Sequence, residues 1–330
     1  MSNRDRPPGG LRQRLAEALA RGGSPLESLR GAEPADERDG LLALLGIYDL
    51  SLGPAVGGAG FGRWQGHPVV ATVKWRLEAE LLETLEKLDR ARRWALPDDP
   101  VAALRALAAA DKVPAIYRWL AERADYREIV EFLALEGGPD GGFDDLVAIC
   151  QVGLRGEAKL ELARNYWDEM GRGEGQAVHT ELYRRLARAV DLRPVPREDQ
   201  PVEALRRAAL GPFLVVNRWL QPEALGALGL IEMQAGPRCR QVVTALRRTG
   251  APADAIPFYA EHATADPRHG KQWLDNAVGT LGRADPAIGV GMVRGARWRW
   301  AVNAAFLTAV GRLVGAPDCS CPAAALQAAG

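Results

Sequence analysis

The sequence predicts an all-α fold. Apolar residues recur three and four positions apart through almost every long stretch, and this spacing places them on one face of a helix. Alternation of apolar and polar residues, which is typical of a half-buried strand, is almost absent. The one stretch that suggests it, 67–73, runs directly into a long helical pattern. Clusters of Gly, Pro and Asp separate the helical stretches, as turns do in a bundle of helices.

The predicted helices follow one another along most of the chain. The longest early one, 69–96, is rich in Leu on one face and charged on the other. Asp99 and Pro100 are typical of the N-cap and first turn of the next helix, and Pro114 is expected to kink or end that helix. The remaining helices are predicted at 126–136, 143–153, 156–170, 176–190, 201–211, 222–236, 237–250, 255–266, 269–282 and 289–313.

The N-terminal segment differs from the rest in composition. Its first 35 or so residues are rich in Gly, Pro and charge, which indicates a flexible or loosely packed arm with a short helix near 11–20. We therefore expect three parts: a flexible or loosely packed arm with short helices at 1–64, one helical domain at 65–315, and a tail at 316–330.

Composition excludes several classes of protein. The 42 basic and 42 acidic residues leave no net charge, whereas nucleic-acid binding needs a basic excess or patch. The N-terminus lacks the apolar core of a secretory signal, and no uncharged apolar stretch is long enough to span a membrane. Two of the four cysteines, Cys150 and Cys239, lie in helical stretches where buried thiols are expected. We expect a cytoplasmic protein that binds neither nucleic acid nor membrane.

Two of the four histidines lie in the short stretch 258–270. His262, Asp266 and His269 are spaced by four and three residues, so on a helix they lie within about 60° of one another. Two imidazoles and a carboxylate suit iron or manganese better than zinc. Pro267 disfavours helix at Asp266, so we expect a kinked or frayed helix that becomes fully ordered with metal bound. The alternative is a solvated helix face on which two histidines lie by coincidence.

A second pair of metal-ligand residue types, Glu169 and His179, flanks the glycine-rich stretch GRGEG. On a straight helix the two residues would be about 15 Å apart, which is too far to share one ion. The three glycines of this stretch allow a bulge or loop that brings the two side chains together.

Glu232 is the only acidic residue in an otherwise apolar helical stretch. An unpaired carboxylate is costly to bury, and coordination to a metal would relieve that cost. A partner arginine, Arg238 or Arg240, is the alternative explanation. His67 lies outside these patterns and is interpreted as a turn or capping residue.

These motifs, E-x9-H, an isolated Glu and H-x3-D-x2-H, resemble in their order those of the haem-oxygenase-like diiron oxidases. The segment NYWDEMGRGEG…VHTELYRRL resembles sequences of a bacterial branch of that superfamily, the iron-containing redox enzymes. The resemblance covers roughly residues 65–285. It implies a haem-oxygenase-like helical bundle with an N-terminal helical extension, which holds two irons, as Fe(II) or Fe(III), in place of haem. The ligands that it implies are Glu169, His179, Glu232, His262, Asp266 and His269.

The same resemblance implies one more carboxylate ligand, from the helix that precedes Glu169, and the sequence leaves this ligand open. Glu136, Asp144 and Asp145 compete for the position. Glu136 closes one helix before a Gly-Pro break, whereas Asp144 opens the next helix and borders its apolar face.

The resemblance also implies a chemistry. Carboxylate and imidazole ligands favour two ferrous ions that deliver two electrons to O2, which is then the co-substrate. We expect an oxidase or oxygenase that acts on a small metabolite, with a free amino acid in a natural-product pathway as the leading choice. The reaction would be a desaturation, ring closure, C–C cleavage or N-oxygenation. An arginine that faces the core would anchor the substrate carboxylate, and the candidates are Arg164, Arg218, Arg238 and Arg240.

Such an enzyme needs an external electron donor as a partner, and a homodimer is one option for its oligomeric state. Two alternatives belong to other classes. One is a metal-free, thiaminase-like hydrolase of the same shape, which would need a nucleophilic cysteine at a pocket. The other is a non-catalytic helical protein that binds a partner, for which the long helix at 69–96 is the best feature.

Overall fold

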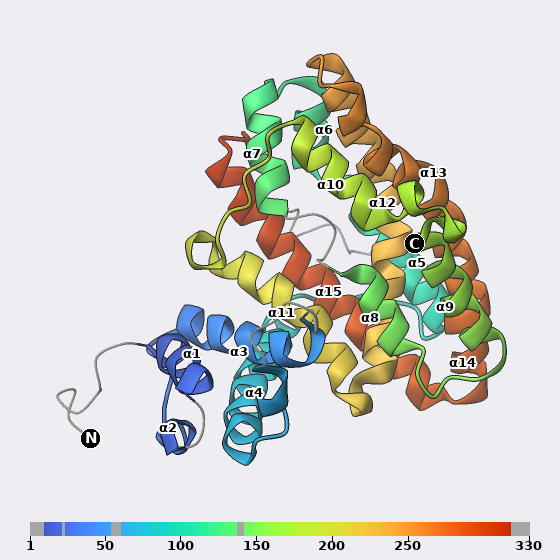
Figure 1. The fold of residues 1–330 in the computed structure, drawn as a ribbon. Coiled ribbons are helices and arrows are strands. Elements are labelled where there is room, and N and C mark those ends of the chain that lie inside the picture. The colour runs from blue at the N-terminus through green and yellow to red at the C-terminus, as the bar shows by residue number, and fades with distance from the viewer. Residues whose placement is uncertain (1–9, 22–23, 54–60, 137–141, 318–330) are drawn as a thin grey trace.

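The structure of the chain is a computed structural model that describes residues 10–21, 24–53, 61–136 and 142–317. Within these ranges every regular element is a helix, which confirms the predicted all-α fold (Figure 1). None of the helices in this part of the chain is both long enough and apolar enough to cross a membrane. The α-helices are α1 (Leu11–Arg21), α2 (Ser24–Glu27), α3 (Glu37–Leu52), α4 (Pro68–Arg90), α5 (Pro100–Ala110), α6 (Ala115–Glu122), α7 (Tyr126–Glu136), α8 (Phe143–Cys150), α9 (Gly156–Glu169), α10 (His179–Ala189), α11 (Val202–Val216), α12 (Gln221–Arg248), α13 (Pro257–Gln272), α14 (Gly279–Ala284) and α15 (Pro286–Leu313). A π-helix, Trp273–Val278, joins α13 to α14.

Prolines begin one predicted helix, interrupt a second and lie inside a third. The stretch 67–73 is not a strand, because His67 is the N-cap of α4 and the helix begins at Pro68. The helix predicted after Asp99 stops before Pro114 and resumes as α6, as that proline suggested. Pro237, in contrast, lies inside α12, so the two helices predicted on either side of it are one.

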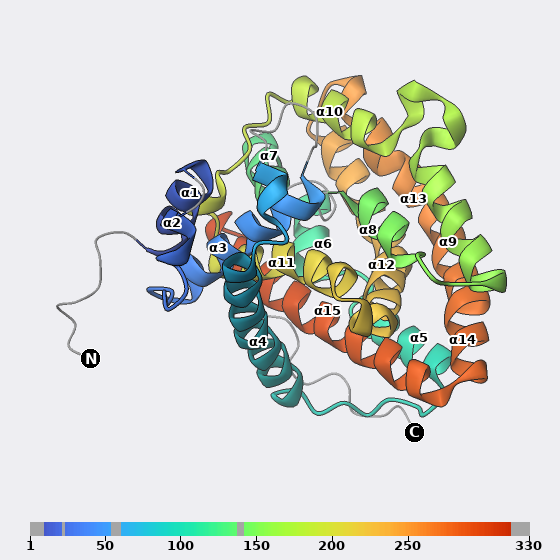
Figure 2. The ribbon, with the colours of Figure 1, turned by 60° about the horizontal axis from the view of Figure 1, so that its bottom comes forward.

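Helix α12 lies at the centre of the arrangement. It makes its most extensive contacts with α13 and α15, and it also packs against α5, α6, α8 and α11. Helices α9, α13 and α14 lie together on one flank of the molecule, and α1 to α4 lie at the opposite end (Figures 1 and 2). Because α12 is buried along most of its length, a polar side chain on it needs a partner inside the protein.

Two glycines allow α12 and α15 to cross closely. A Cβ atom on Gly226 would lie 1.7 Å from the carbonyl oxygen of Met292. One on Gly295 would lie 2.0 Å from the carbonyl oxygen of Glu223. The two helices therefore touch through their backbones, and this contact fixes the position of α12 relative to α15.

The described part of the N-terminal segment packs onto the rest of the protein. In α3, Leu44, Leu45 and Tyr48 are buried in the same hydrophobic core as residues of α11 and α12. The carboxylate of Asp39 accepts a hydrogen bond of 2.6 Å from the backbone N–H of Leu11, which ties α1 to α3. Helix α3 follows the first 35 residues, whose Gly, Pro and charge content suggests a loosely packed arm, and its apolar face supplies this packing. The division into three parts, with its boundaries, stays a prediction.

Cys150 and Cys239 are buried thiols, as their positions in helical stretches predict. Burial raises the pKa of Cys150 to about 12, which leaves roughly one thiol in ten thousand ionised at pH 8. Burial also raises the pKa of Cys239 well above its ordinary value. Iodoacetamide at pH 8 is therefore expected to leave both thiols unmodified in the folded protein and to label both after unfolding in urea, as read by peptide mass spectrometry. Rapid labelling of either one without denaturant would contradict this packing.

Candidate metal centre

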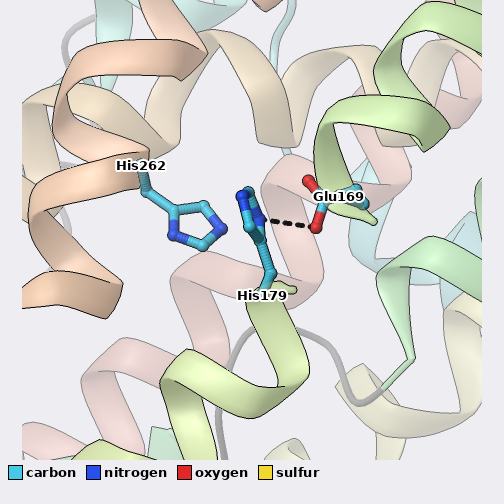
Figure 3. A group of neighbouring side chains, drawn as sticks. All are labelled: Glu169, His179 and His262. Atoms are coloured by element: carbon cyan, nitrogen blue, oxygen red, sulfur yellow. Dashed lines mark ion pairs between the residues drawn. The ribbon is translucent and has the colours of Figure 1, made fainter. Parts of the chain in front are cut away.

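The first part of the site is a sharp turn between α9 and α10. Residues 171–173 all have positive φ angles, of 60°, 54° and 89°, which end α9 after Glu169 and send the chain back. A Cβ atom on Gly171 would lie 2.5 Å from the carbonyl carbon of Ala177, so only glycine fits there. As a result, Glu169 Oε2 lies 2.7 Å from His179 Nδ1 (Figure 3). The loop predicted from the glycine-rich stretch is confirmed.

The second part is α13, whose buried residues include three ligand candidates, His262, Asp266 and His269. The helix is continuous through Pro267, so the predicted frayed end is absent from this segment. Arg240 of α12 supplies the physical reason. Its guanidinium donates a hydrogen bond of 2.8 Å to the carbonyl oxygen of Ala263, the acceptor that loses its helical donor at the proline four residues later.

Helix α12 brings Glu232 to the same place. A Cβ atom on Gly270 would lie 2.9 Å from the Cα atom of Met233, so α12 and α13 approach closely beside the site. One carboxylate oxygen of Glu232 lies 3.5 Å from His269 Nδ1. The other accepts a hydrogen bond of 2.7 Å from the side-chain amide of Asn165 on α9.

The structure gathers the six residues into two triads. In each triad, one ligand atom per residue lies within 4.8 Å of the others, and all the side chains are buried. Figure 3 shows the side chains of Glu169, His179 and His262 turned toward one another. The histidine-rich triad is Glu169, His179 and His262; the carboxylate-rich triad is Glu232, Asp266 and His269. The triads are adjacent, because His262 and Asp266 are one turn apart on α13. Mixed imidazole and carboxylate ligands suit iron or manganese.

Buried atoms of the carboxylate-rich triad indicate that a cation fits there. Oε2 of Glu232, Oδ2 of Asp266 and Nδ1 of His269 have no hydrogen-bond partner among the described residues. Burial raises the pKa of Asp266 well above its ordinary value, and the charges of Glu232 and Glu169 raise it further. Unpaired buried acceptors are costly, and a divalent ion at this position would relieve the cost.

The ring orientation of His262 is set by its own helix. Nδ1 lies 2.8 Å from the carbonyl oxygen of Phe258, so Nδ1 carries the proton and Nε2 is left as the ligand atom. Burial, and then the neighbouring His179, lowers the pKa of His262. The imidazole is therefore neutral, as a metal ligand must be.

The candidates for a further carboxylate ligand lie outside the triads. Glu136, the last residue of α7, accepts hydrogen bonds from the hydroxyls of Tyr117 and Tyr259 at 2.7 and 2.8 Å. Asp144 is half-buried in the first turn of α8, and Asp145 beside it is exposed. Since none of the three belongs to either triad, the structure gives no support to a ligand from this region.

A cavity of about 70 Å³ borders His262. Its walls include Glu136, Gln234 and Arg299, and the buried Nε2 of Gln234 has no hydrogen-bond partner among the described residues. A wider cavity of about 270 Å³ shares Glu136 and Arg299 with the first and extends to α3, where Leu45 lines it. A small molecule in the smaller cavity would lie next to His262 of the histidine-rich triad.

Of the four arginines proposed to face the core, Arg238 lines the smaller cavity, where it donates a hydrogen bond to the backbone oxygen of Asp111. The other three pair with Glu161 or with backbone carbonyls. Arg207 and Arg299 line both cavities and are not among the sequence candidates. Arg299 is the one charged residue among the buried residues of α15, but Arg294 and Arg297 lie close to it in the sequence, so its burial could not be read from the sequence in the way that Glu232 was singled out.

A family model covers the part of the chain that carries both triads. The model, described as iron-containing redox enzyme, matches residues 130–304, slightly more than half of the chain. No curated protein matches the chain.

Proposed function

Because the chain belongs to the family of iron-containing redox enzymes, we propose that it is a non-haem diiron enzyme that uses O2 to oxidise a small metabolite. Family membership makes it an oxidoreductase, and its helices form the haem-oxygenase-like bundle that the sequence resemblance implies. The two irons, O2 as the oxidant, and the substrate belong to the proposal.

The observation that carries the proposal is the pair of adjacent buried triads. Three protein ligands for each ion leave coordination positions open for small molecules. Three carboxylates oppose the four positive charges of two ferrous ions, so the protein neutralises most of that charge inside the bundle. When bound, two ferrous ions supply two electrons to O2, and an external donor restores them.

The walls of the smaller cavity support a free amino acid as the substrate. Glu136 presents a carboxylate that is held by the hydroxyls of Tyr117 and Tyr259. Burial and the charge of Glu136 raise the pKa of both tyrosines well above the ordinary value, so both remain neutral donors. Gln234 and Arg299 provide donors on the same cavity. A carboxylate and several donors together suit the ammonium and carboxylate groups of a zwitterion. The resemblance favours a natural-product pathway for such a reaction.

The cavity also bears on the alternative of a thiaminase-like hydrolase. Cys239 lines the smaller cavity, which is where that alternative needs a nucleophile. Burial, followed by the charges of Asp266 and Glu136, raises the pKa of Cys239 well above its ordinary value. A nucleophilic cysteine requires the opposite shift, so the electrostatics disfavour this alternative.

The proposal is tested by metal content and then by oxygen consumption. Metal-free protein is loaded with Fe(II) without oxygen, desalted and analysed for iron, and about two irons per chain are expected from the two triads. The loaded protein is then screened on an oxygen electrode, with a chemical reductant, against free amino acids and fatty acids. Zn(II)-loaded protein is the control, because zinc accepts the same ligand types and has no redox chemistry.

Two outcomes would count against the proposal. Folded protein that takes up less than one iron per chain would favour the non-catalytic, partner-binding alternative. Protein with two irons that consumes no oxygen with any member of the panel would remove the support for an amino-acid or fatty-acid substrate.

A further inference from the structure

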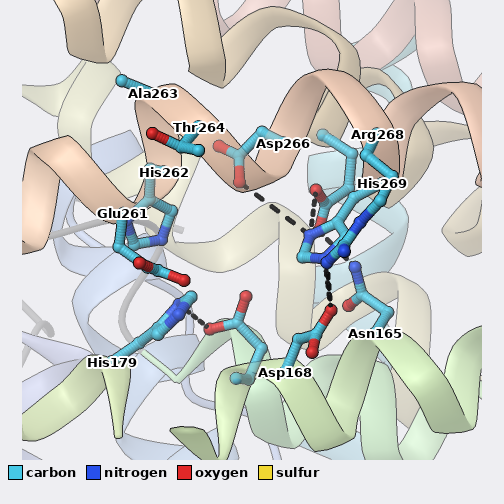
Figure 4. A network of polar contacts seen from close by, with 12 residues as sticks. Asn165, Asp168, His179, Glu261, His262, Ala263, Thr264, Asp266, Arg268 and His269 are labelled. Carbon is cyan, nitrogen blue, oxygen red and sulfur yellow. Dashed lines mark hydrogen bonds and ion pairs between the residues drawn. The ribbon is translucent and has the colours of Figure 1, made fainter. Parts of the chain in front are cut away.

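Asp168 links the two helices that carry most of the site. It lies at the end of α9, and its Oδ2 lies 2.7 Å from Nε2 of His269 on α13 (Figure 4). The same oxygen accepts a hydrogen bond of 2.7 Å from Arg268, and Oδ1 accepts one of 3.3 Å from Arg172. His269 is buried, with only 2% of its side chain exposed, so this contact is shielded from water on the histidine side.

The two ring nitrogens of His269 face different groups. Nε2 faces Asp168, whereas Nδ1 faces Glu232 and Asp266 of the carboxylate-rich triad, at 3.5 and 4.0 Å. If Nε2 donates its proton to Asp168, Nδ1 is left with a free lone pair that points into the triad. Nδ1 is the ring atom that lacks a hydrogen-bond partner among the described residues.

We propose that Asp168 is a positioning residue for the metal centre, which holds His269 in the tautomer and orientation that present Nδ1 to the ion. His262 on the same helix is held the other way, because its Nδ1 faces the carbonyl oxygen of Phe258. The two imidazoles of α13 therefore bind through opposite ring nitrogens. The inference rests on the metal centre of the proposed function and not on its substrate.

Asp168 directly precedes a ligand candidate in the sequence, so it is close to both triads. The next residue, Glu169, belongs to the histidine-rich triad, while Asp168 holds a member of the carboxylate-rich triad. Consecutive residues at the end of one helix thus tie both triads together. Arg172 and Arg268, which are exposed, pair with the carboxylate of Asp168 on the side away from the triads.

The test compares metal binding by wild-type protein with binding by Asp168→Asn and Asp168→Ala. Equilibrium dialysis with Mn(II) under nitrogen is expected to show two ions per wild-type chain and a 10- to 100-fold weaker second ion in Asp168→Ala, with a smaller loss in Asp168→Asn. Arg172→Gln is the matched control, since it removes an exposed ion pair to Asp168 and leaves the contact with His269. Glu157→Gln, on the exposed face of α9, controls for a change of charge on that helix. Both controls are expected to stay within about twofold of wild type.

A second measurement reads the ring nitrogens directly. The chain has only four histidines, so nitrogen-15 NMR of histidine-labelled, Zn(II)-loaded protein gives a spectrum that can be assigned. We expect His269 to carry its proton on Nε2 in the wild type, and to lose that defined tautomer in Asp168→Ala while far-UV circular dichroism stays unchanged.

The outcomes separate this inference from the proposed function. Wild-type affinity for both ions in Asp168→Ala, or a proton on Nδ1 of His269 in the wild type, would overturn the role of Asp168 and leave the metal centre in place. Failure of the wild type itself to bind metal would overturn both.

Discussion

His262→Ala is expected to lower iron uptake from about two ions per chain to one or none and to abolish oxygen consumption by the iron-loaded protein. The imidazole is the member of the histidine-rich triad that also borders the smaller cavity, so its loss removes a ligand at the place where the proposed substrate would approach the metal. Iron analysis and an oxygen electrode measure the two effects, and far-UV circular dichroism checks that the helices remain.

The chain provides a matched control for this variant in His67. That residue is the N-cap of α4, and its side chain makes no capping hydrogen bond. His67→Ala is therefore expected to bind iron and to turn over like the wild type. Two irons and full activity in His262→Ala would refute the assignment of His262 as a ligand.

Gly226→Ala is expected to destabilise the folded protein by on the order of 3 kcal/mol or more. The added methyl group would lie 1.7 Å from the carbonyl oxygen of Met292, and a backbone atom cannot move aside as a flexible side chain can. The helices α12 and α15 would have to separate, and α12 carries Glu232. Urea unfolding should show the lower free energy of unfolding, and iron analysis should show weaker uptake.

Gly46→Ala is the control for this substitution. Gly46 lies inside α3, and a Cβ atom there would meet no atom within 4 Å. Since alanine has the higher helix propensity, this variant is expected to gain up to about 1 kcal/mol of stability. Equal stability of the two variants would show that the contact between α12 and α15 is looser than described.

The sequence predicted which candidate ligands lie together where these residue types are scarce and their spacing is local. The residues His262, Asp266 and His269 lie on one helix, so their common face follows from helical geometry alone. The turn after Glu169 followed from its glycines, because positive φ angles favour that residue type.

The sequence predicted less well those features that depend on a hydrogen-bond or ion-pair partner from a distant part of the chain. Pro267 suggested a break in α13, and only the packing of α12 shows that Arg240 replaces the lost hydrogen-bond donor. Asp168 resembles a surface residue in sequence, since its contact with His269 lies 101 positions away. Glu136 and Asp144 were plausible as ligands by residue type, but the packing of α7 and α8 decides where their carboxylates lie.

Because α3 lines the wider cavity, the ligand candidates and one wall of that cavity come from different parts of the sequence. All six triad residues lie between residues 130 and 304, whereas Leu45, on one wall of that cavity, lies well before this range. A chain shortened to the family match would keep every ligand candidate and lose part of the lining of the wider cavity. Exchange of the N-terminal helices among relatives would therefore offer a route to new substrate ranges that leaves the ion-binding residues untouched.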